Sequence, residues 1–145
     1  MNTHVRWMIR RDIDEILAFD PDQTEANALE TLRQRDVIGQ VAEDKDSKVV
    51  GYFMYQLHKT YLTILHFFVS PDQRAKGYGR ALMERLKGKL NSRRYRLRFD
   101  VSDGQIDMHL FLRAMGFSAR VLDSETYRFG YVHVEKRVPV NAVAG

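Results

Sequence analysis

One short stretch of the chain combines glycine with basic side chains in a pattern that suits a phosphorylated ligand. It reads Arg74-Ala75-Lys76-Gly77-Tyr78-Gly79-Arg80, and it lies between an apolar segment and an amphipathic one. A helix that begins here would offer unpaired N–H groups and a partial positive charge, and both attract phosphate. Glycine has no Cβ, so the backbone can approach such a ligand closely. The spacing predicts a pyrophosphate-binding turn at the start of a helix.

The pattern of apolar residues predicts the elements that hold this turn in place. Strands are expected over residues 5–9, 38–42, 49–57, 61–69, 95–101, 117–122 and 127–138, and helices over 12–19, 24–35, 77–90 and 106–115. Asp12 and Thr24 are candidate N-caps, with Glu15 at the capping-box position, and Gly116 is a candidate C-cap. Trp7 and the phenylalanines are expected in the core. The order β-α-α-β-β-β-α-β-α-β-β predicts an α/β fold in which helices cover a mixed, twisted seven-stranded sheet.

Length and composition narrow the class of protein. The chain has 145 residues, which suits a single domain over residues 1–145, and residues 139–145 are expected to form a flexible tail. It contains no cysteine, which excludes disulfides and thiolate metal sites. Its five histidines are scattered, so no metal is expected. No apolar run is long enough for a membrane span, and the N-terminal residues do not resemble a signal peptide, so a cytoplasmic protein is expected.

Charge is distributed unevenly along the chain. Residues 12–30 contain seven acids and no base, whereas residues 74–98 contain ten bases and one acid, Glu84. The basic stretch is either a solvated helix face or an anion-binding surface for a phosphorylated cofactor or nucleic acid. The acidic stretch is a weak indication of a cationic acceptor, because acids on exposed helices often serve only solubility.

The turn and a second block together resemble the GNAT superfamily of acetyltransferases. Arg74, Gly77 and Gly79 match the family pattern Arg/Gln-x-x-Gly-x-Gly/Ala, which lies between the fourth strand and the third helix. Residues 111–117, Phe-Leu-Arg-Ala-Met-Gly-Phe, resemble the family block that ends in Gly-Phe. The resemblance extends from about residue 5 to about residue 138. The spacing from Asp100 to the Gly-Phe pair is similar to that of RimI-type protein N-terminal acetyltransferases.

The resemblance implies a donor, an acceptor and a site for each. Acetyl-CoA would donate the acetyl group to a primary amine, the fourth and fifth strands would splay apart, and the pantetheine arm would lie between them beside Phe68 and Val69. Gln105 falls where the family often has an asparagine that contacts this arm, and it offers the same hydrogen-bonding groups. Family members often pair through the sheet, which leaves a homodimer open. A membrane or nucleic-acid partner is not expected.

The chemical groups are less complete than the cofactor site. The family tyrosine that protonates the leaving thiolate falls at Leu112, which cannot donate a proton. Asp100 stands where RimI-like enzymes carry a catalytic glutamate, so it is the preferred base, with a turn-capping aspartate as the alternative. His66 is a second candidate base, although a half-buried structural histidine is favoured. Tyr127 could replace the missing acid. The backbone N–H near Val69 is the expected oxyanion donor.

Three functions follow from these observations. The first is an N-acetyltransferase that acts on a protein N-terminus, a lysine or a small amine in a ternary complex. The second is a CoA-binding protein of this fold that is catalytically weak or inactive, because Leu112 replaces the acid. The third is a nucleic-acid-binding module that uses the basic stretch, although interleaved aromatic residues and a helix-turn-helix pattern are missing.

Overall fold

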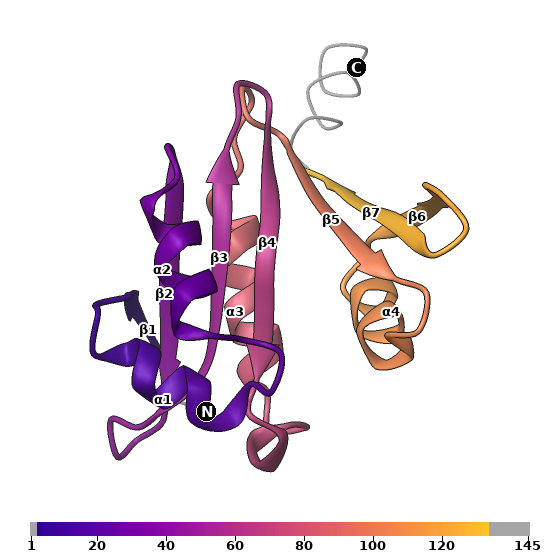
Figure 1. Ribbon diagram of the computed structural model, residues 1–145. Coiled ribbons are helices and arrows are strands. Elements are labelled where there is room, and N and C mark those ends of the chain that lie inside the picture. Colours follow the sequence, from indigo (N-terminus) through magenta and orange to yellow (C-terminus); the bar gives the residue numbers. More distant parts are fainter. Residues whose placement is uncertain (1–2, 134–145) are drawn as a thin grey trace, which may run out of the picture. The chain divides into compact units, whose positions relative to one another are not determined.

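Seven strands form one mixed sheet in the computed structural model, which describes residues 3–133 (Figure 1). The strands are β1 His4–Trp7, β2 Val37–Glu43, β3 Val49–Leu57, β4 Tyr61–Val69, β5 Arg96–Ser102, β6 Ser118–Val121 and β7 Thr126–Val132, and their order in the sheet is β1-β2-β3-β4-β5-β7-β6. The helices are α1 Asp12–Phe19, α2 Glu25–Arg33, α3 Tyr78–Lys87 and α4 Ile106–Ala114, and a short 3-10 helix, η1, spans Pro71–Gln73. Strand β4 runs parallel to β5, whereas β1–β2, β2–β3, β5–β7 and β6–β7 are antiparallel.

The observed order of helices and strands confirms the predicted fold class. Every predicted element is present, with ends that differ by a few residues. The last strand was expected over residues 127–138 and is observed as Thr126–Val132, while the rest of that range and the predicted tail at 139–145 lie outside the described residues. No helix within residues 3–133 has the length and apolar character needed to cross a membrane.

The described chain divides into two compact units. The first comprises residues 3–57 with 65–85, and the second comprises residues 58–64 with 86–133. Strand β4 therefore contributes its first part to the second unit and its last part to the first. The parallel pairing of β4 with β5 joins Tyr61–Ile64 to Arg96–Phe99 and covers only the first four residues of each strand.

In the first unit, α1 and α2 lie on one face of β2 and β3, and α3 lies on the other (Figure 1). Ile13 and Ile16 of α1 and Ala28 of α2 are buried against Val41 and Tyr52 of the sheet. In each helix the apolar residues recur every three or four positions and so form one face. The apolar faces of both helices pack against the same side of the strands. Burial of these side chains is the main stabilising contribution in this unit.

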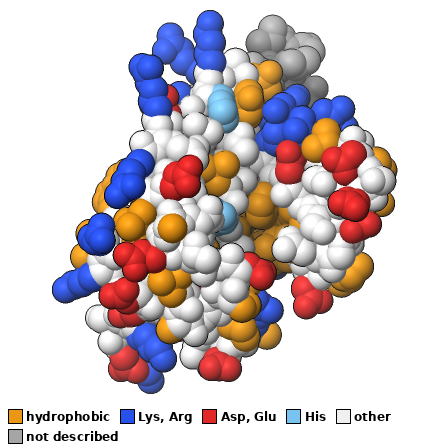
Figure 2. Space-filling view, viewed as in Figure 1, with side chains coloured by type: hydrophobic (Ala, Val, Ile, Leu, Met, Phe, Trp, Pro, Cys, Tyr) orange, Lys and Arg blue, Asp and Glu red, His pale blue; other side chains and the backbone are white. Residues whose placement is uncertain are grey.

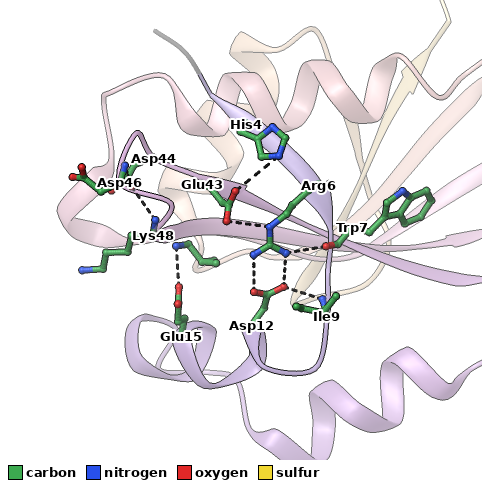
Figure 3. A network of polar contacts seen from close by, with 11 residues as sticks. His4, Arg6, Trp7, Ile9, Asp12, Glu15, Glu43, Asp44, Asp46 and Lys48 are labelled. Atoms are coloured by element: carbon green, nitrogen blue, oxygen red, sulfur yellow. Dashed lines mark hydrogen bonds and ion pairs between the residues drawn. The ribbon is translucent and has the colours of Figure 1, made fainter.

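An ion-pair network ties the first strand to the first helix (Figure 3). The Arg6 guanidinium donates to both oxygens of Asp12, at 2.8 and 2.9 Å, and its Nε lies 3.0 Å from a carboxylate oxygen of Glu43. Burial alone would raise the pKa of Asp12, but hydrogen bonds from Arg6 and from the Ile9 N–H hold it below its ordinary value. The network fixes α1 against β1 and β2.

The same network corrects the predicted helix cap at Asp12. Asp12 is the first helical residue, and the N-cap position belongs to Arg11, whose side chain makes no capping bond. Glu15 does not complete a capping box, because its carboxylate accepts from the N–H of Val49 at 2.9 Å. Asp12 therefore forms an ion pair with Arg6 and does not serve as the N-cap that the sequence pattern predicted.

Two other predicted helix ends are confirmed. The Thr24 hydroxyl accepts from the Asn27 N–H at 3.1 Å and caps α2. Gly116 follows α4 with φ of 91°, and the Phe117 N–H closes back on the Leu112 carbonyl at 3.0 Å. This left-handed residue with its backward hydrogen bond is a Schellman-type end, which glycine adopts without steric cost.

In the second unit, one face of β5 and β7 is buried and the other is not. Leu97, Phe99 and Val101 of β5 are buried together with Phe129 of β7, on the side where α4 packs. At the start of this unit Lys87 donates to the Met115 carbonyl at 2.6 Å, so the end of α3 is tied to the end of α4. The opposite face of the strands carries polar residues.

Trp7 was expected in the core, and that prediction is wrong. Its side chain is 61% exposed. It is the last residue of β1, which is the edge strand of the sheet, so few neighbours lie beside it. Val5, two residues earlier, is the buried residue of this strand.

Candidate functional site

The turn that precedes α3 contains two residues with left-handed backbone. Ala75 and Gly77 have positive φ values of 63° and 94°, while Lys76 between them does not. Alternation of left- and right-handed residues points successive N–H groups to one side, which forms a concave site for anions. Helix α3 then begins at Tyr78 with no acid in its first turn. The geometry fits a diphosphate, because the loop and the helix end attract negative charge together.

Arg74 joins this turn to the end of β4. Its Nε donates to the Val69 carbonyl at 3.1 Å, and its guanidinium lies 4.9 Å from the centre of the Phe68 ring. Phe68 in turn stacks on Phe19, with ring centres 6.1 Å apart. Arg74 therefore positions the loop, and its positive charge would also attract a phosphate.

The remaining turn residues differ in how they could reach a ligand. Tyr78 is buried, so its side chain belongs to the core and only its main chain is available to the turn. Lys76 and Arg80 are exposed. The exposed cations can bind phosphate oxygens directly. Gly79 has no side chain, so a ligand can approach the main chain of the first helical turn closely.

Strand β4 is irregular where it approaches the turn. Leu65 and Phe68 both pack against the core cluster of the first unit. Side chains three residues apart point to opposite faces of a regular strand, so the alternation is interrupted between these two residues, as it is at a β-bulge. Such an interruption leaves main-chain groups outside the regular pairing of the strand, in the segment that also contains His66.

His66 is half-buried on β4 and lies against Tyr52 of β3, with ring centres 6.5 Å apart. Burial lowers the pKa of His66 below its ordinary value, although the charge of Asp20 opposes this shift. The imidazole is therefore neutral near pH 7. A neutral imidazole can accept a proton, as a general base must.

Sequence reasoning missed a buried polar cluster beside His66. The Tyr52 hydroxyl donates to Asp20 at 2.6 Å and accepts from the Gln23 amide at 3.0 Å. Burial, together with Asp20, raises the pKa of Tyr52. The only sequence signal was Asp20 before a helix-breaking proline, and nothing local linked it to a tyrosine 32 residues away.

The buried acids also correct the interpretation of the acidic stretch. Asp12 and Asp20 are both buried and are held by Arg6 and Tyr52 inside the first unit. They are structural groups and do not face solvent. Two of the seven acids thus give no support to a cationic acceptor.

Asp100 lies on β5 and is held by Arg128 of β7. The two carboxylate oxygens accept from Nε and a terminal nitrogen of Arg128 at 2.8 and 3.0 Å, and the Asp100 side chain is 39% exposed. The Arg128 hydrogen bond, with a smaller contribution from Arg98, lowers the pKa of Asp100. A carboxylate held in this way is a weaker proton acceptor than an ordinary one.

Tyr127 and Asp100 do not lie on the same face of the sheet. In the register of β5 and β7, Asp100 is opposite Arg128 and Val101 is opposite Tyr127. Neighbouring residues of a strand point to opposite faces, so the two candidate side chains lie on opposite sides of the sheet. Tyr127 packs edge-on against His109 of α4, with ring centres 5.2 Å apart.

His109 is half-buried on α4 and contacts β5 and β7. Its Nε2 donates to the Ser102 carbonyl at 2.8 Å, and its ring contacts Phe129 as well as Tyr127. It fastens α4 to the end of β5. The helical sequence pattern around His109 does not predict this contact with β5.

Gln105 and Leu112 lie near opposite ends of α4. Gln105 is exposed at the N-cap position of the helix, and its side chain makes no capping bond. Leu112 is completely buried, so the position of the family tyrosine is a core position in this protein. The Leu112 side chain packs in the core and has no proton to donate.

Several bases of residues 74–98 have structural partners. Arg85 donates to the Val5 carbonyl at 3.1 Å within the first unit, and Arg94 donates to the His58 carbonyl at 2.6 Å within the second. With Lys87 on Met115 and Arg74 on Val69, four of these ten bases donate to main-chain carbonyls. The basic stretch is therefore not one continuous anion-binding surface.

The predicted site residues are divided between the two units. The first unit carries His66, Phe68, Val69 and the turn, residues 74–80, and Arg74 of the turn contacts Phe68 and Val69 at the end of β4. The second unit carries Asp100, Gln105 and Tyr127. Within residues 3–133 no cluster of three or more side chains is suited to hold a metal ion.

Comparison with known proteins identifies the family of this chain. A model of the acetyltransferase (GNAT) family matches residues 4–117. Ard1 from Thermoplasma volcanium is similar in structure, with a TM-score of 0.79, 19% identity, and coverage of 92% of this chain and 99% of that one. No match is found among curated protein sequences.

Two further solved structures share the fold. The ribosomal-protein-S18-alanine N-acetyltransferase from Escherichia coli has a TM-score of 0.72 at 15% identity, over 89% of this chain and 91% of that one. The PaiA N-acetyltransferase from Thermoplasma acidophilum, in complex with coenzyme A, has a TM-score of 0.68 at 14% identity, over 91% and 99%. These TM-scores show a common fold, and the family match covers most of the chain. The chain belongs to the GNAT family of acetyltransferases.

Proposed function

We propose that this protein is an N-acetyltransferase that transfers the acetyl group of acetyl-CoA directly to a primary amine. The amine belongs to a protein N-terminus, a lysine or a small molecule. The observation that carries the proposal is the loop of Ala75 and Gly77, whose left-handed residues precede the N-terminus of α3. Proteins of this family use acetyl-CoA, and one structural neighbour holds coenzyme A.

The chain's own residues account for cofactor binding as follows. The main chain of residues 75–79 would hold the diphosphate, and Lys76 and Arg80 would add charge beside it. Acetyl-CoA, when bound, supplies an acetyl thioester that is reactive toward amines. Main-chain groups near Phe68 and Val69 would orient the rest of the cofactor, because β4 departs from regular alternation there.

Titration calorimetry with acetyl-CoA tests this site. We expect the double variant Lys76→Gln and Arg80→Gln to bind acetyl-CoA about tenfold more weakly than the unchanged protein, because charge-assisted contacts to phosphate are lost. The matched control, Lys45→Gln with Lys48→Gln, removes two exposed cations from the turn before β3 and should bind normally. Equal affinity of both variants would mean that the site is misplaced.

His66 is the proton acceptor that the geometry supports best. Burial keeps the imidazole neutral, and its strand segment leads directly into the cofactor turn. Asp100, the base preferred from sequence, has both oxygens bonded to Arg128 and a lowered pKa. We assign Asp100 the task of orienting Arg128, and His66 the task of accepting the amine proton, directly or through water.

Complete burial of Leu112 favours one alternative, a CoA-binding protein of this fold without catalysis. Release of free thiol in the presence of acetyl-CoA and a panel of amines separates the two functions. The panel includes peptides with free N-termini, lysine-containing peptides and polyamines. Thiol release that depends on an amine supports the enzyme. Acetyl-CoA binding without any such turnover supports the alternative.

A further inference from the structure

The face of β5, β7 and β6 that points away from α4 is lined with arginine. Across these strands Asp100 is opposite Arg128, which is opposite Arg120, and Arg98 is opposite Gly130. Residues directly opposite each other share a face, and so do alternate residues of one strand, so Arg96 belongs to this face too. We call the surface formed by Arg96, Arg98, Asp100, Arg120 and Arg128 the arginine face.

The arginine face is hollow at its centre. A pocket of about 240 Å³ is lined by residues of all three strands, among them Arg96, Arg98, Arg120, Arg128 and Gly130. At Gly130 a Cβ would meet only the Leu97 carbonyl oxygen, at 3.8 Å. The glycine therefore leaves a depression between the guanidinium groups, where a ligand side chain could enter.

Charge on this face is unbalanced. The one carboxylate, Asp100, already holds Arg128. Arg98 lies over the Tyr61 ring at 4.3 Å and Arg96 over the Tyr95 ring at 5.9 Å, while within residues 3–133 no carboxylate pairs with Arg96, Arg98 or Arg120. Figure 2 shows Lys and Arg side chains gathered over this part of the second unit.

We propose that the arginine face binds an extended peptide segment that carries carboxylates at alternate residues. Arg96 and Arg98 are two residues apart on one strand, so their Cα atoms lie about 7 Å apart, and alternate side chains of an extended peptide recur at the same spacing. Planar guanidinium groups bind carboxylates through two parallel hydrogen bonds. The Asp100–Arg128 pair shows that this face already holds one carboxylate in that way.

Nucleic acid suits the same surface less well. Single strands bind through bases stacked on exposed aromatic rings, in addition to phosphate contacts. On this side of the strands the Tyr61 ring is covered by Arg98. The charges on their own would attract either polymer, so the experiment must compare the two directly.

Fluorescence anisotropy with the full chain tests the proposal. The probes are two N-terminally labelled peptides of equal charge, Glu-Ser-Glu-Ser-Glu-Ser and Glu-Glu-Glu-Ser-Ser-Ser, and saturating coenzyme A is present so that cofactor binding does not interfere. We expect the alternating peptide to bind more tightly. The variant Arg96→Gln with Arg120→Gln should weaken its binding about tenfold, and salt should weaken it as well.

The matched control removes two other arginines of the same unit. Arg93 is exposed in the turn before β5, and Arg113 is exposed on α4, on the opposite side of the strands. The variant Arg93→Gln with Arg113→Gln loses the same net charge, and we expect less than a twofold change. An equal loss in both variants would mean that only overall charge matters, which would overturn the proposal.

The variant Asp100→Asn tests the proposal through an expected gain, and not a loss, of peptide affinity. The carboxylate competes with a ligand for Arg128, so its removal should tighten binding of the alternating peptide several-fold. Unchanged or weaker binding would overturn the proposal. It would also be overturned if a labelled single-stranded oligonucleotide of equal charge bound more tightly than the peptide and lost its binding in Arg96→Gln with Arg120→Gln. None of these measurements requires acetyl transfer, so their outcome is independent of the proposed enzyme activity.

Discussion

The side chains of His66 and Asp100 show how neighbours decide the use of a titratable group. Asp100 has the residue type of a base and lies near the end of β5, yet the Arg128 guanidinium binds both of its oxygens. His66 is half-buried beside Tyr52, and burial keeps it neutral. The partner across the sheet could not be predicted without the register of β5 and β7, which places position 100 opposite position 128.

The first prediction concerns His66 directly. We expect His66→Gln to lower kcat by roughly 10²- to 10⁴-fold, because glutamine cannot accept a proton at neutral pH. Acetyl-CoA affinity, measured by calorimetry, should be nearly unchanged. The control is His4→Gln, at an exposed histidine on β1, which should keep full activity. Full activity of His66→Gln would exclude His66 as the base.

The second prediction concerns pH. Burial lowers the pKa of His66 below its ordinary 6.5, so the imidazole is neutral above that value and becomes protonated, and inactive as a base, as pH falls through it. We therefore expect kcat/KM to decline on the acid side at a pH below 6.5, and this limb should be absent in His66→Gln. A limb only below pH 3.8 would instead indicate Asp100, whose pKa is lowered from that value.

At the scale of elements, the fold could be predicted from the sequence but the tertiary contacts could not. Periodicity placed every strand and helix because local propensity and burial agree there. It failed at Asp12, where an ion pair with Arg6 replaced a cap, and at Trp7, where an edge position leaves an aromatic residue exposed. It made no prediction of the faces on which Asp100 and Tyr127 lie, because that placement follows only from the register of β5 and β7.

The third prediction concerns the start of α2. Thr24 accepts from the Asn27 N–H, so Thr24→Ala should lower the free energy of unfolding by about 1 kcal/mol. Thr24→Asn keeps a capping oxygen and should be close to the unchanged protein. Urea denaturation followed by circular dichroism measures both. If the alanine and asparagine variants are equally destabilised, the hydroxyl contributes through another contact.

At the scale of the whole molecule, cofactor binding should appear as stability. A ligand that binds only the folded chain stabilises it in proportion to the logarithm of its concentration, by about 2.7 kcal/mol at a hundred times its Kd. We therefore expect acetyl-CoA and coenzyme A to raise the melting temperature, and Lys76→Gln with Arg80→Gln to need about tenfold more ligand for the same rise. This is the fourth prediction. If neither compound raises the melting temperature at any concentration, both this prediction and the proposed cofactor site are wrong.

The Arg6 network restricts the order in which this sequence can change during evolution. Loss of Arg6 first would leave the buried Asp12 carboxylate without its cation, whereas Asp12→Asn first would leave Arg6 still paired with Glu43. Descendant lineages should therefore lose the acid before the base. Among relatives, positions 6 and 12 should vary together, so that a sequence without the arginine also lacks the aspartate.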